Sequence, residues 1–264
     1  MSIIYETLPD RTRIAYLQDG PSGRTGRTGF FWLGGYKSDM QGSKSEAIAA
    51  LARDTRRPAL RFDYSGHGQS SGLFVDGTIT AWLEQSLHMF TKFTQERCVV
   101  IGSSMGGWLA LLLVRALQER GLAIAQRIAG LVLVAPAADM TTELMWKALS
   151  KQERRDIEEK GVAHIPSKYG EPLPITAKLL EDGVKHLILK PGIDCGVPVR
   201  ILQGDIDPDV PPQHAWRVYE AIRGDDVTLT IIKGGDHRLS SPGQLALLRE
   251  SALRLAERAD GVIV

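Results

Sequence analysis

Short apolar runs, separated by helical patterns, set the strongest limit on how this chain can fold. Three of them are apolar on both faces, as strands inside a parallel sheet are: Phe30–Leu33, Cys98–Ile101 and Leu131–Val134. Val199–Leu202 is a further strand candidate, and Leu109–Val114 is a helical stretch that is apolar on every side. Because strands alternate with helices, we expect an α/β fold with a mainly parallel central sheet.

Two parts of the chain depart from this alternation. The segments Ile3–Leu8 and Thr12–Leu17 flank the turn Pro9–Arg11 and predict an antiparallel hairpin. Residues 137–192 carry helix signals but no core strand, and this length of insertion predicts a helical lid over the carboxyl edge of the sheet. The alternative is an ordinary crossover with extra helices. We expect one domain over residues 1–264, a sheet of about eight strands and a lid at residues 137–192.

Three capping-box patterns mark expected helix starts. They are Ser43-x-x-Glu46, Ser150-x-x-Glu153 and Ser241-Pro242-x-Gln244. In the last of them a first-turn proline strengthens the prediction.

The charge balance argues against several kinds of partner. The chain has 32 Lys+Arg and 31 Asp+Glu, a net charge of +1, so no basic field attracts nucleic acid or anionic lipid. The cluster Arg53, Arg56 and Arg57 lies at the end of a predicted helix, where we expect it to stay solvated and complement the helix dipole. No apolar run is long enough to span a bilayer, so we expect no stable membrane insertion.

Cysteine usage and the N-terminus favour a cytoplasmic protein. Cys98 and Cys195 are the two cysteines, and Cys98 lies in an apolar strand where we expect it to be buried and inert. Two cysteines in a chain of 264 residues do not form a disulfide framework, which favours a reducing compartment. The segment Met1–Glu6 reaches a charged residue too early for a signal peptide.

A Gly-x-Ser-x-Gly pentapeptide, Gly102–Gly106, follows the strand Cys98–Ile101 and opens a helical stretch at Trp108. This strand–turn–helix setting is typical of a nucleophile elbow, which would make Ser104 a nucleophile. The glycines on either side allow a sharp turn where a Cβ atom would collide. The alternative is that they only permit close packing of strand and helix.

A serine hydroxyl barely ionises at neutral pH, so such a nucleophile needs a base and an acid that orients the base. Of six histidines, His237 alone follows the last predicted strand and precedes the last helix, and we expect it to be the base. Asp207 lies three residues after the loop glycine Gly204 and directly before a proline, and we expect it to be the acid. Asp205 is the alternative.

The tetrahedral intermediate also needs hydrogen-bond donors for its oxyanion. We expect one to be the backbone N–H of Met105 and the other to be the N–H of Tyr36, in the loop after Leu33. Gly35 would let the main chain approach the substrate closely. This set of residues requires no metal and no organic cofactor.

With Gly102–Gly106, Asp207 and His237 in this order, the chain resembles the α/β-hydrolases over essentially its whole length. The turn Asp63–Ser70 is similar to their Asp-x-x-Gly-x-Gly-x-Ser turn, which is structural there. The resemblance therefore implies that Asp63 and His67 maintain the fold.

Further motifs resemble one branch, the mitochondrial palmitoyl-protein thioesterase and acyl-glucuronide esterase type. These motifs are Gly35–Met40, Arg61–Gly66, Ile101–Trp108, Leu133–Ala137 and Glu143–Trp146. The resemblance implies cleavage of acyl thioesters or esters, long-chain ones included, from a small molecule or an acylated protein. Since no mitochondrial presequence is recognisable, the chain looks like a bacterial relative. The alternatives are a short-chain carboxylesterase, a serine peptidase and a catalytically inactive scaffold.

Apolar residues of the predicted lid have two possible uses. They would either shelter an acyl chain or seal the lid onto the core. These residues are Leu144, Met145, Trp146, Leu149, Leu179 and Leu180.

Overall fold

The computed structural model describes residues 2–121, 123–166 and 172–262, and its centre is a sheet of eight strands. From one edge to the other these are β1 (Ile4–Thr7), β2 (Arg13–Asp19), β4 (Ala59–Phe62), β3 (Gly29–Leu33), β5 (Cys98–Ser103), β6 (Ile128–Val134), β10 (Val199–Gly204) and β12 (Val227–Ile232). Strand β2 is antiparallel to β1 and β4, and the other pairings are parallel. The predicted hairpin and the mainly parallel sheet are confirmed.

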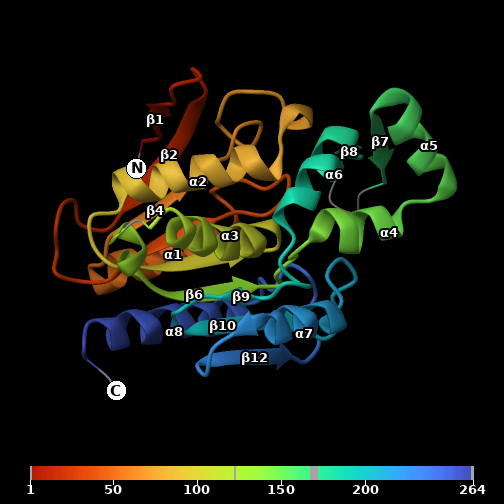
Figure 1. Cartoon of the computed structure of the whole chain (residues 1–264). Helices are drawn as coiled ribbons and strands as arrows, with labels where there is room; N and C mark the ends of the chain where they lie inside the picture. Colours follow the sequence, from red (N-terminus) through yellow and green to blue (C-terminus); the bar gives the residue numbers. More distant parts are fainter. Residues whose placement is uncertain (1, 122, 167–171, 263–264) are drawn as a thin grey trace.

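Helices cover both faces of the sheet (Figure 1). Apolar residues of α2 (Ile79–Phe93), α3 (Met105–Glu119) and α7 (Pro212–Ala221) pack on one face, and those of α1 (Ser43–Thr55) and α8 (Pro242–Ala259) on the other. Smaller elements are η1 (Phe74–Asp76), η2 (Ala123–Arg127) and the paired two-residue strands β9 (Ile193–Asp194) and β11 (Ile222–Arg223). As the sequence predicts, Leu109–Val114 in α3 is buried throughout. Within the described part of the chain, no helix combines the length and apolarity needed to cross a bilayer.

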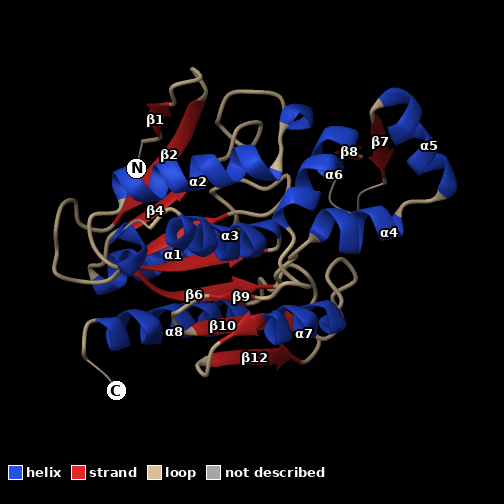
Figure 2. Ribbon diagram, in the orientation of Figure 1, coloured by secondary structure: helices blue, strands red, loops and turns tan. Residues whose placement is uncertain are grey.

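Residues 137–192 form a segment beyond the arrowheads of the parallel strands, green to cyan in Figure 1. Its elements are a π-helical turn η3 (Thr141–Met145), α4 (Trp146–Ala148), α5 (Lys151–Lys160), β7 (Val162–Ile165), β8 (Leu173–Thr176), α6 (Ala177–Gly183) and η4 (Val184–His186). The antiparallel pair β7–β8 is an addition to the expected helices, and its strand β7 is the red arrow beside α5 in Figure 2. Residues 167–171, between these strands, lie outside the described residues.

Several buried hydrogen bonds anchor this segment to the rest of the molecule. The buried carboxylate of Asp139 accepts the backbone N–H groups of Ile188 (2.8 Å) and Leu189 (3.0 Å), so it joins the two ends of the segment. His214 of α7 bonds the Ala138 carbonyl through Nε2 at 2.9 Å. The segment is thus fixed at its base by contacts between residues far apart in the sequence.

Two of the three expected capping boxes are confirmed, at Ser150 and at Ser241. The one at Ser43 is wrong, because α1 begins at Ser43 itself and the capping position is Gly42, which offers no side chain. The carboxylate of Glu46 instead pairs with Arg61 of β4.

The expectation that the arginine cluster stays solvated is also wrong for Arg57. This side chain is buried, and its guanidinium donates to Asp260 at 2.6 Å and to the Thr28 carbonyl at 2.9 Å. The partner lies at the end of the last helix, which a local reading of the sequence cannot reveal.

Candidate active site

Ser104 lies at the turn between β5 and α3, with the unusual backbone angles φ 56° and ψ −118°. Both flanking glycines are sterically required. A Cβ atom on Gly102 would lie 2.2 Å from the Gly106 carbonyl oxygen, and one on Gly106 would lie 2.1 Å from the Leu33 carbonyl oxygen. The turn therefore depends on close backbone approaches that only glycine permits.

Three side chains selected from the sequence meet at this turn. His237, in the loop between β12 and α8, places Nε2 3.2 Å from the Ser104 hydroxyl oxygen. Its other ring nitrogen, Nδ1, lies 2.8 Å from Oδ2 of Asp207, in the loop after β10. The Asp207 side chain is fully buried, whereas 18% of the His237 side chain is exposed.

The surroundings of Asp207 fix its charge and the tautomer of His237. Burial alone would raise the pKa of Asp207, but hydrogen bonds from His237 and from two backbone N–H groups outweigh it, so the pKa lies below its ordinary value. Because an ionised carboxylate can only accept, the proton of the neutral imidazole sits on Nδ1. The lone pair of Nε2 then faces the Ser104 hydroxyl.

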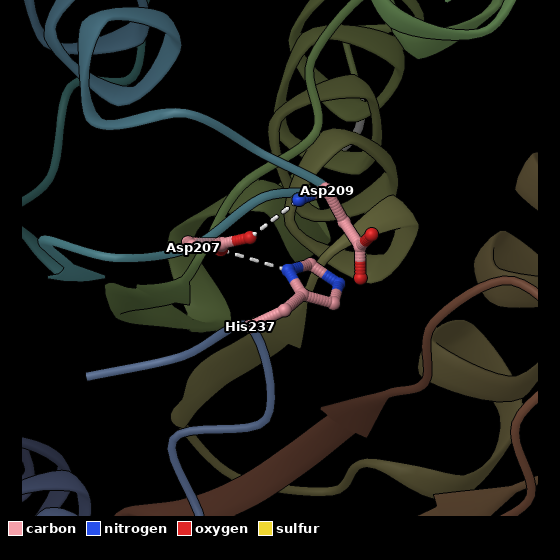
Figure 3. Close-up of side chains that lie close together, drawn as sticks. All are labelled: Asp207, Asp209 and His237. Carbon is pink, nitrogen blue, oxygen red and sulfur yellow. Dashed lines mark hydrogen bonds and ion pairs between the residues drawn. The ribbon is translucent and has the colours of Figure 1, made fainter. Parts of the chain in front are cut away.

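The other two aspartates of the acid loop lie differently. Asp205 accepts the N–H of Gly234 at 2.6 Å and lies 3.5 Å from the Lys233 ammonium, so it joins two loops. Asp209 stands beside the imidazole ring, on the side away from Asp207 (Figure 3). Of the two candidate acids, Asp207 is the one bonded to His237.

Asp207, Asp209 and His237 each offer a ligand atom, and these atoms lie within 4.8 Å of one another. The His237–Asp207 hydrogen bond, however, places a proton between Nδ1 and Oδ2. The second oxygen of Asp207 already accepts two backbone N–H groups, at 2.9 Å each. This chemistry suits proton transfer, while a cation would have to displace those donors.

The predicted oxyanion donors border the same turn. Met105 is the first residue of α3, where helix N–H groups have no partner inside the helix. A Cβ atom on Gly35 would lie only 3.4 Å from Ser104 Cβ, so the main chain before Tyr36 runs in contact with the nucleophile turn. The next residue, Lys37, has φ 56° and donates its N–H to Nε2 of His67 at 3.2 Å.

His67 acts on this loop as a buried, neutral acceptor. Burial lowers its pKa to about 4, and its Nδ1 lies 3.2 Å from the Ser65 carbonyl. Asp63, from the same glycine-rich turn, accepts the N–H groups of Met40 (2.6 Å) and Gln69 (2.8 Å). Both residues hold backbone segments in place, as their resemblance to the family turn implies.

Two residues that the sequence reasoning missed also contact the site. Gln203, the residue before Gly204, places Nε2 3.2 Å from Oδ2 of Asp207. The ammonium of Lys44, in the first turn of α1, donates to the carbonyl of Arg238, next to His237, and burial lowers its pKa to about 8. A cation in a first helical turn opposes the helix dipole, which was the signal available in the sequence for Lys44.

The apolar residues of the segment at 137–192 mostly pack on one another. Leu149 is buried in a small cluster with Ile157, Ala163 and Ile175, to which Met145, Trp146 and Leu180 add partly buried side chains. Leu179 belongs to the main core, and Leu144 packs against it. Most of these residues therefore form a cluster inside the segment itself, and only Leu144, Met145 and Leu179 pack on the main core.

The doubly covered parallel sheet and the glycine-flanked turn at its carboxyl edge define an α/β-hydrolase. A family model described as serine aminopeptidase, S33, matches residues 42–186. Since this is more than half of its length, the chain belongs to that family of hydrolases.

Individual relatives point to a narrower group. The mitochondrial palmitoyl-protein thioesterase ABHD10 of Bos taurus is 31% identical over 251 residues, which cover 94% of this chain and 78% of the relative. A putative hydrolase from Agrobacterium vitis S4 has a similar structure, with a TM-score of 0.92 and 41% identity over 97% of this chain and all of that one. The mouse α/β-hydrolase domain-containing protein 10 superposes with a TM-score of 0.84 and 28% identity over 98% and 99% of the two chains. The chain is thus a hydrolase enzyme that resembles the palmitoyl-protein thioesterases.

Proposed function

We propose that this hydrolase cleaves acyl thioesters or carboxylic esters through an acyl-serine intermediate. The observation that supports this best is the position of His237, with one ring nitrogen 3.2 Å from Ser104 Oγ and the other 2.8 Å from Asp207 Oδ2. An imidazole between a hydroxyl and a carboxylate is placed to take the hydroxyl proton and to hold it.

In the first step His237 Nε2 takes the proton of Ser104 while the serine oxygen attacks the acyl carbon. The carbonyl electron pair moves onto its oxygen, then returns and breaks the bond to the leaving group, which takes the proton from Nε2 and departs as a thiol or alcohol. Water attacks the acyl-serine by the same route and releases the carboxylic acid. Asp207 stays ionised throughout and stabilises the imidazolium.

We assign the oxyanion site to the backbone N–H groups of Met105 and Tyr36. The N-terminal end of α3 carries partial positive charge, which favours an anion next to Met105. The glycine at position 35 lets the Tyr36 amide approach the same place. Loss of one such donor typically costs about 3–4 kcal/mol of transition-state stabilisation.

Palmitoyl thioesters are our proposed long-chain substrates, because the Bos taurus relative is named as a palmitoyl-protein thioesterase. The acyl carrier would be a small molecule or an acylated protein. A series of thioesters and p-nitrophenyl esters from acetyl to palmitoyl tests this. A kcat/KM that rises with chain length is expected, and a maximum at acetyl would indicate a short-chain carboxylesterase instead.

Labelling with a fluorophosphonate tests the nucleophile. S104A is expected to abolish labelling and to lower turnover of a p-nitrophenyl ester by more than about 10⁴-fold. S103A removes the neighbouring hydroxyl and is the matched control, expected to label and turn over like the wild type. Full turnover by S104A would refute the assignment, and a wild-type chain that never labels would indicate an inactive scaffold.

A serine peptidase is the second candidate, favoured by the description of the matching family model. Aminoacyl p-nitroanilides and short peptides distinguish it. A kcat/KM for these amides above that for every ester and thioester would make the peptidase the better assignment.

We also propose a reducing compartment, the cytoplasm, for this chain. Cys98 and Cys195 are buried free thiols, and burial raises the pKa of each to about 12. Since the curated relatives are named as mitochondrial, cell fractionation with a tagged chain is the test, and a membrane-enclosed pool would contradict the proposal.

A further inference from the structure

Gln203 is a fully buried amide at the end of β10. Its Nε2 lies near three acceptor oxygens: the Gly204 carbonyl at 3.1 Å, Asp207 Oδ2 at 3.2 Å and the Val210 carbonyl at 2.9 Å. These three acceptors fix which end of the amide faces the acid loop, because the amide oxygen would be repelled there.

The other end of this amide is unsatisfied. Oε1 of Gln203 is buried and has no hydrogen-bond partner among the residues described. A buried acceptor without a partner costs about 1–3 kcal/mol, and a methionine of similar length would avoid that cost. The neighbours Ile201 and Leu202 are buried and apolar, so an amide at this place needs an explanation beyond packing.

The explanation lies in the carboxylate of Asp207. Its Oδ2 accepts from both His237 Nδ1 (2.8 Å) and Gln203 Nε2 (3.2 Å), while Oδ1 accepts the N–H groups of Asp209 and Val210. Four donors leave the carboxylate one orientation, with Oδ2 directed at the imidazole. Asp209 provides a second carboxylate on the other side of that ring (Figure 3). The four donors named above bond Asp207.

We propose that Gln203 is a positioning residue for the reaction, which holds Asp207 Oδ2 in line with His237 Nδ1. This inference rests on the proposed function, in which Asp207 orients the base. Gln203 also shares the charge of Oδ2 with His237, so it weakens the attraction of that oxygen for the imidazolium. Among the residues described, the other charged groups near the pair are Asp209 in the same loop, Asp236 and Arg238 on either side of His237, and Lys44 of α1.

Q203M removes the donor and keeps the length of the side chain. We expect kcat for a p-nitrophenyl ester to fall about 10- to 100-fold, as for other residues that orient a reacting group, with KM nearly unchanged. Because Oδ2 then attracts the imidazolium more strongly, the acid limb of the kcat/KM profile should move to higher pH. A change confined to the unfolding midpoint would show a merely structural role and overturn the proposal.

Q203E, which has the same size as the wild type, carries the test if Q203M does not fold. The new carboxyl group lies next to Asp207, and two adjacent carboxylates cannot both ionise easily. Protonated, it donates to Oδ2 and retains activity. Ionised, it repels Asp207, so kcat should fall with rising pH where the wild type does not, in folded protein checked by circular dichroism at each pH.

Q85M is the matched control, because Gln85 of α2 is also buried and bonds Ser65 through both amide atoms. It should lower stability and leave the pH profile unchanged. D207N distinguishes a failure of the Gln203 inference from a failure of the acid assignment. If D207N is inactive while both Gln203 variants keep the wild-type kcat and profile, only the Gln203 inference fails; a fully active D207N would refute the acid assignment itself.

Discussion

Ser104 holds its backbone in a conformation that a serine adopts only under constraint. Angles of φ 56° and ψ −118° lie outside the regions open to most L-residues and cost on the order of 1–3 kcal/mol. Three backbone hydrogen bonds maintain them: the Ser104 N–H donates to Val134, and its carbonyl accepts from Gly107 and Ala137. The strain is thus concentrated at the residue whose hydroxyl faces His237.

Asp207 and Asp205 provide a matched pair of substitutions in one loop. D207N replaces the acceptor of the His237 Nδ1–H by a group that also donates, which favours the wrong tautomer, so kcat should fall on the order of 10³–10⁴-fold. D205N should change kcat only a few-fold, because that carboxylate bonds Gly234. Steady-state kinetics of both variants on the same ester measure these losses. A larger loss of kcat in D205N than in D207N would assign the acid to Asp205.

At this scale the sequence predicted residues that belong to a motif or follow a strand end. The Gly-x-Ser-x-Gly motif and the strand ends predict Ser104, Asp207 and His237, and the structure links them through two hydrogen bonds of His237. No sequence pattern indicates Gln203, which is notable only for its contacts, and the unfavourable helix position of Lys44 does not reveal its partner. Lys44 meets the carbonyl of Arg238 across 194 positions of sequence.

Among the elements, the segment at residues 137–192 is the most independent. It has its own apolar cluster, and Asp139 closes its base by accepting two N–H groups from the returning chain. Asp139 has φ 54°, a left-handed conformation that aspartate and asparagine tolerate better than most residues. The segment therefore has a core of its own and is closed at its base, and Asp182 of α6 and Pro174 of β8 also bond Thr80 and Tyr36 of the main domain.

D139N tests this closure without changing the backbone preference. One carboxylate oxygen becomes an NH₂ group that faces an N–H, so the free energy of unfolding should fall by about 1–3 kcal/mol. Hydrogen exchange at Ile188 and Leu189 should accelerate. D156N, on the exposed face of α5, is the control and should leave both unchanged; equal exchange in the two variants would show that Asp139 does not close the segment.

The strands β7 and β8 show where element prediction from this sequence fails. Each has four residues, and β8 contains Pro174 in the middle of its pattern Leu173–Thr176. Proline is rare inside strands, except at edges, so the pattern argued against a strand. A two-stranded sheet has only edges, which is why the proline fits. The buried strands of the core are easier to predict, because each is a short apolar run bounded by turn residues.

For the molecule as a whole, one buried ion pair joins the N-terminal half of the chain to the end of the last helix. Arg57 donates to Asp260 at 2.6 Å, and the same carboxylate accepts the N–H and hydroxyl of Thr28. This pairs the loops before β3 and β4 with the end of α8. No local sequence pattern reveals this pair, because its two residues are 203 positions apart.

Global stability should depend on two buried histidines. Burial lowers the pKa of His67 and of His214 to about 4, against 6.5 for an ordinary histidine. Between these values the unfolded chain binds more protons than the folded one, so stability is lost as pH falls from about 6.5 to about 4, by roughly 2–3 kcal/mol per histidine at pH 4.5. Urea unfolding at neutral pH and at pH 4.5 measures the loss.

H214Q provides the control for this prediction. It removes one titrating group and keeps an amide donor for the Ala138 carbonyl. The difference in the free energy of unfolding between the two pH values should therefore decrease by the contribution of one histidine. An undiminished difference would assign the acid sensitivity to other groups.

Tyr36 directly follows Gly35, which lies against Ser104, and its hydroxyl donates to the Pro174 carbonyl of β8 at 2.6 Å. Because we propose that the Tyr36 N–H donates to the oxyanion, a displacement of β8 should also disturb the oxyanion site. Thermodynamic linkage makes such coupling reciprocal. A transition-state analogue bound at Ser104 should therefore reduce the mobility of β8. Conversely, a ligand that immobilises β8 should raise the affinity for the analogue.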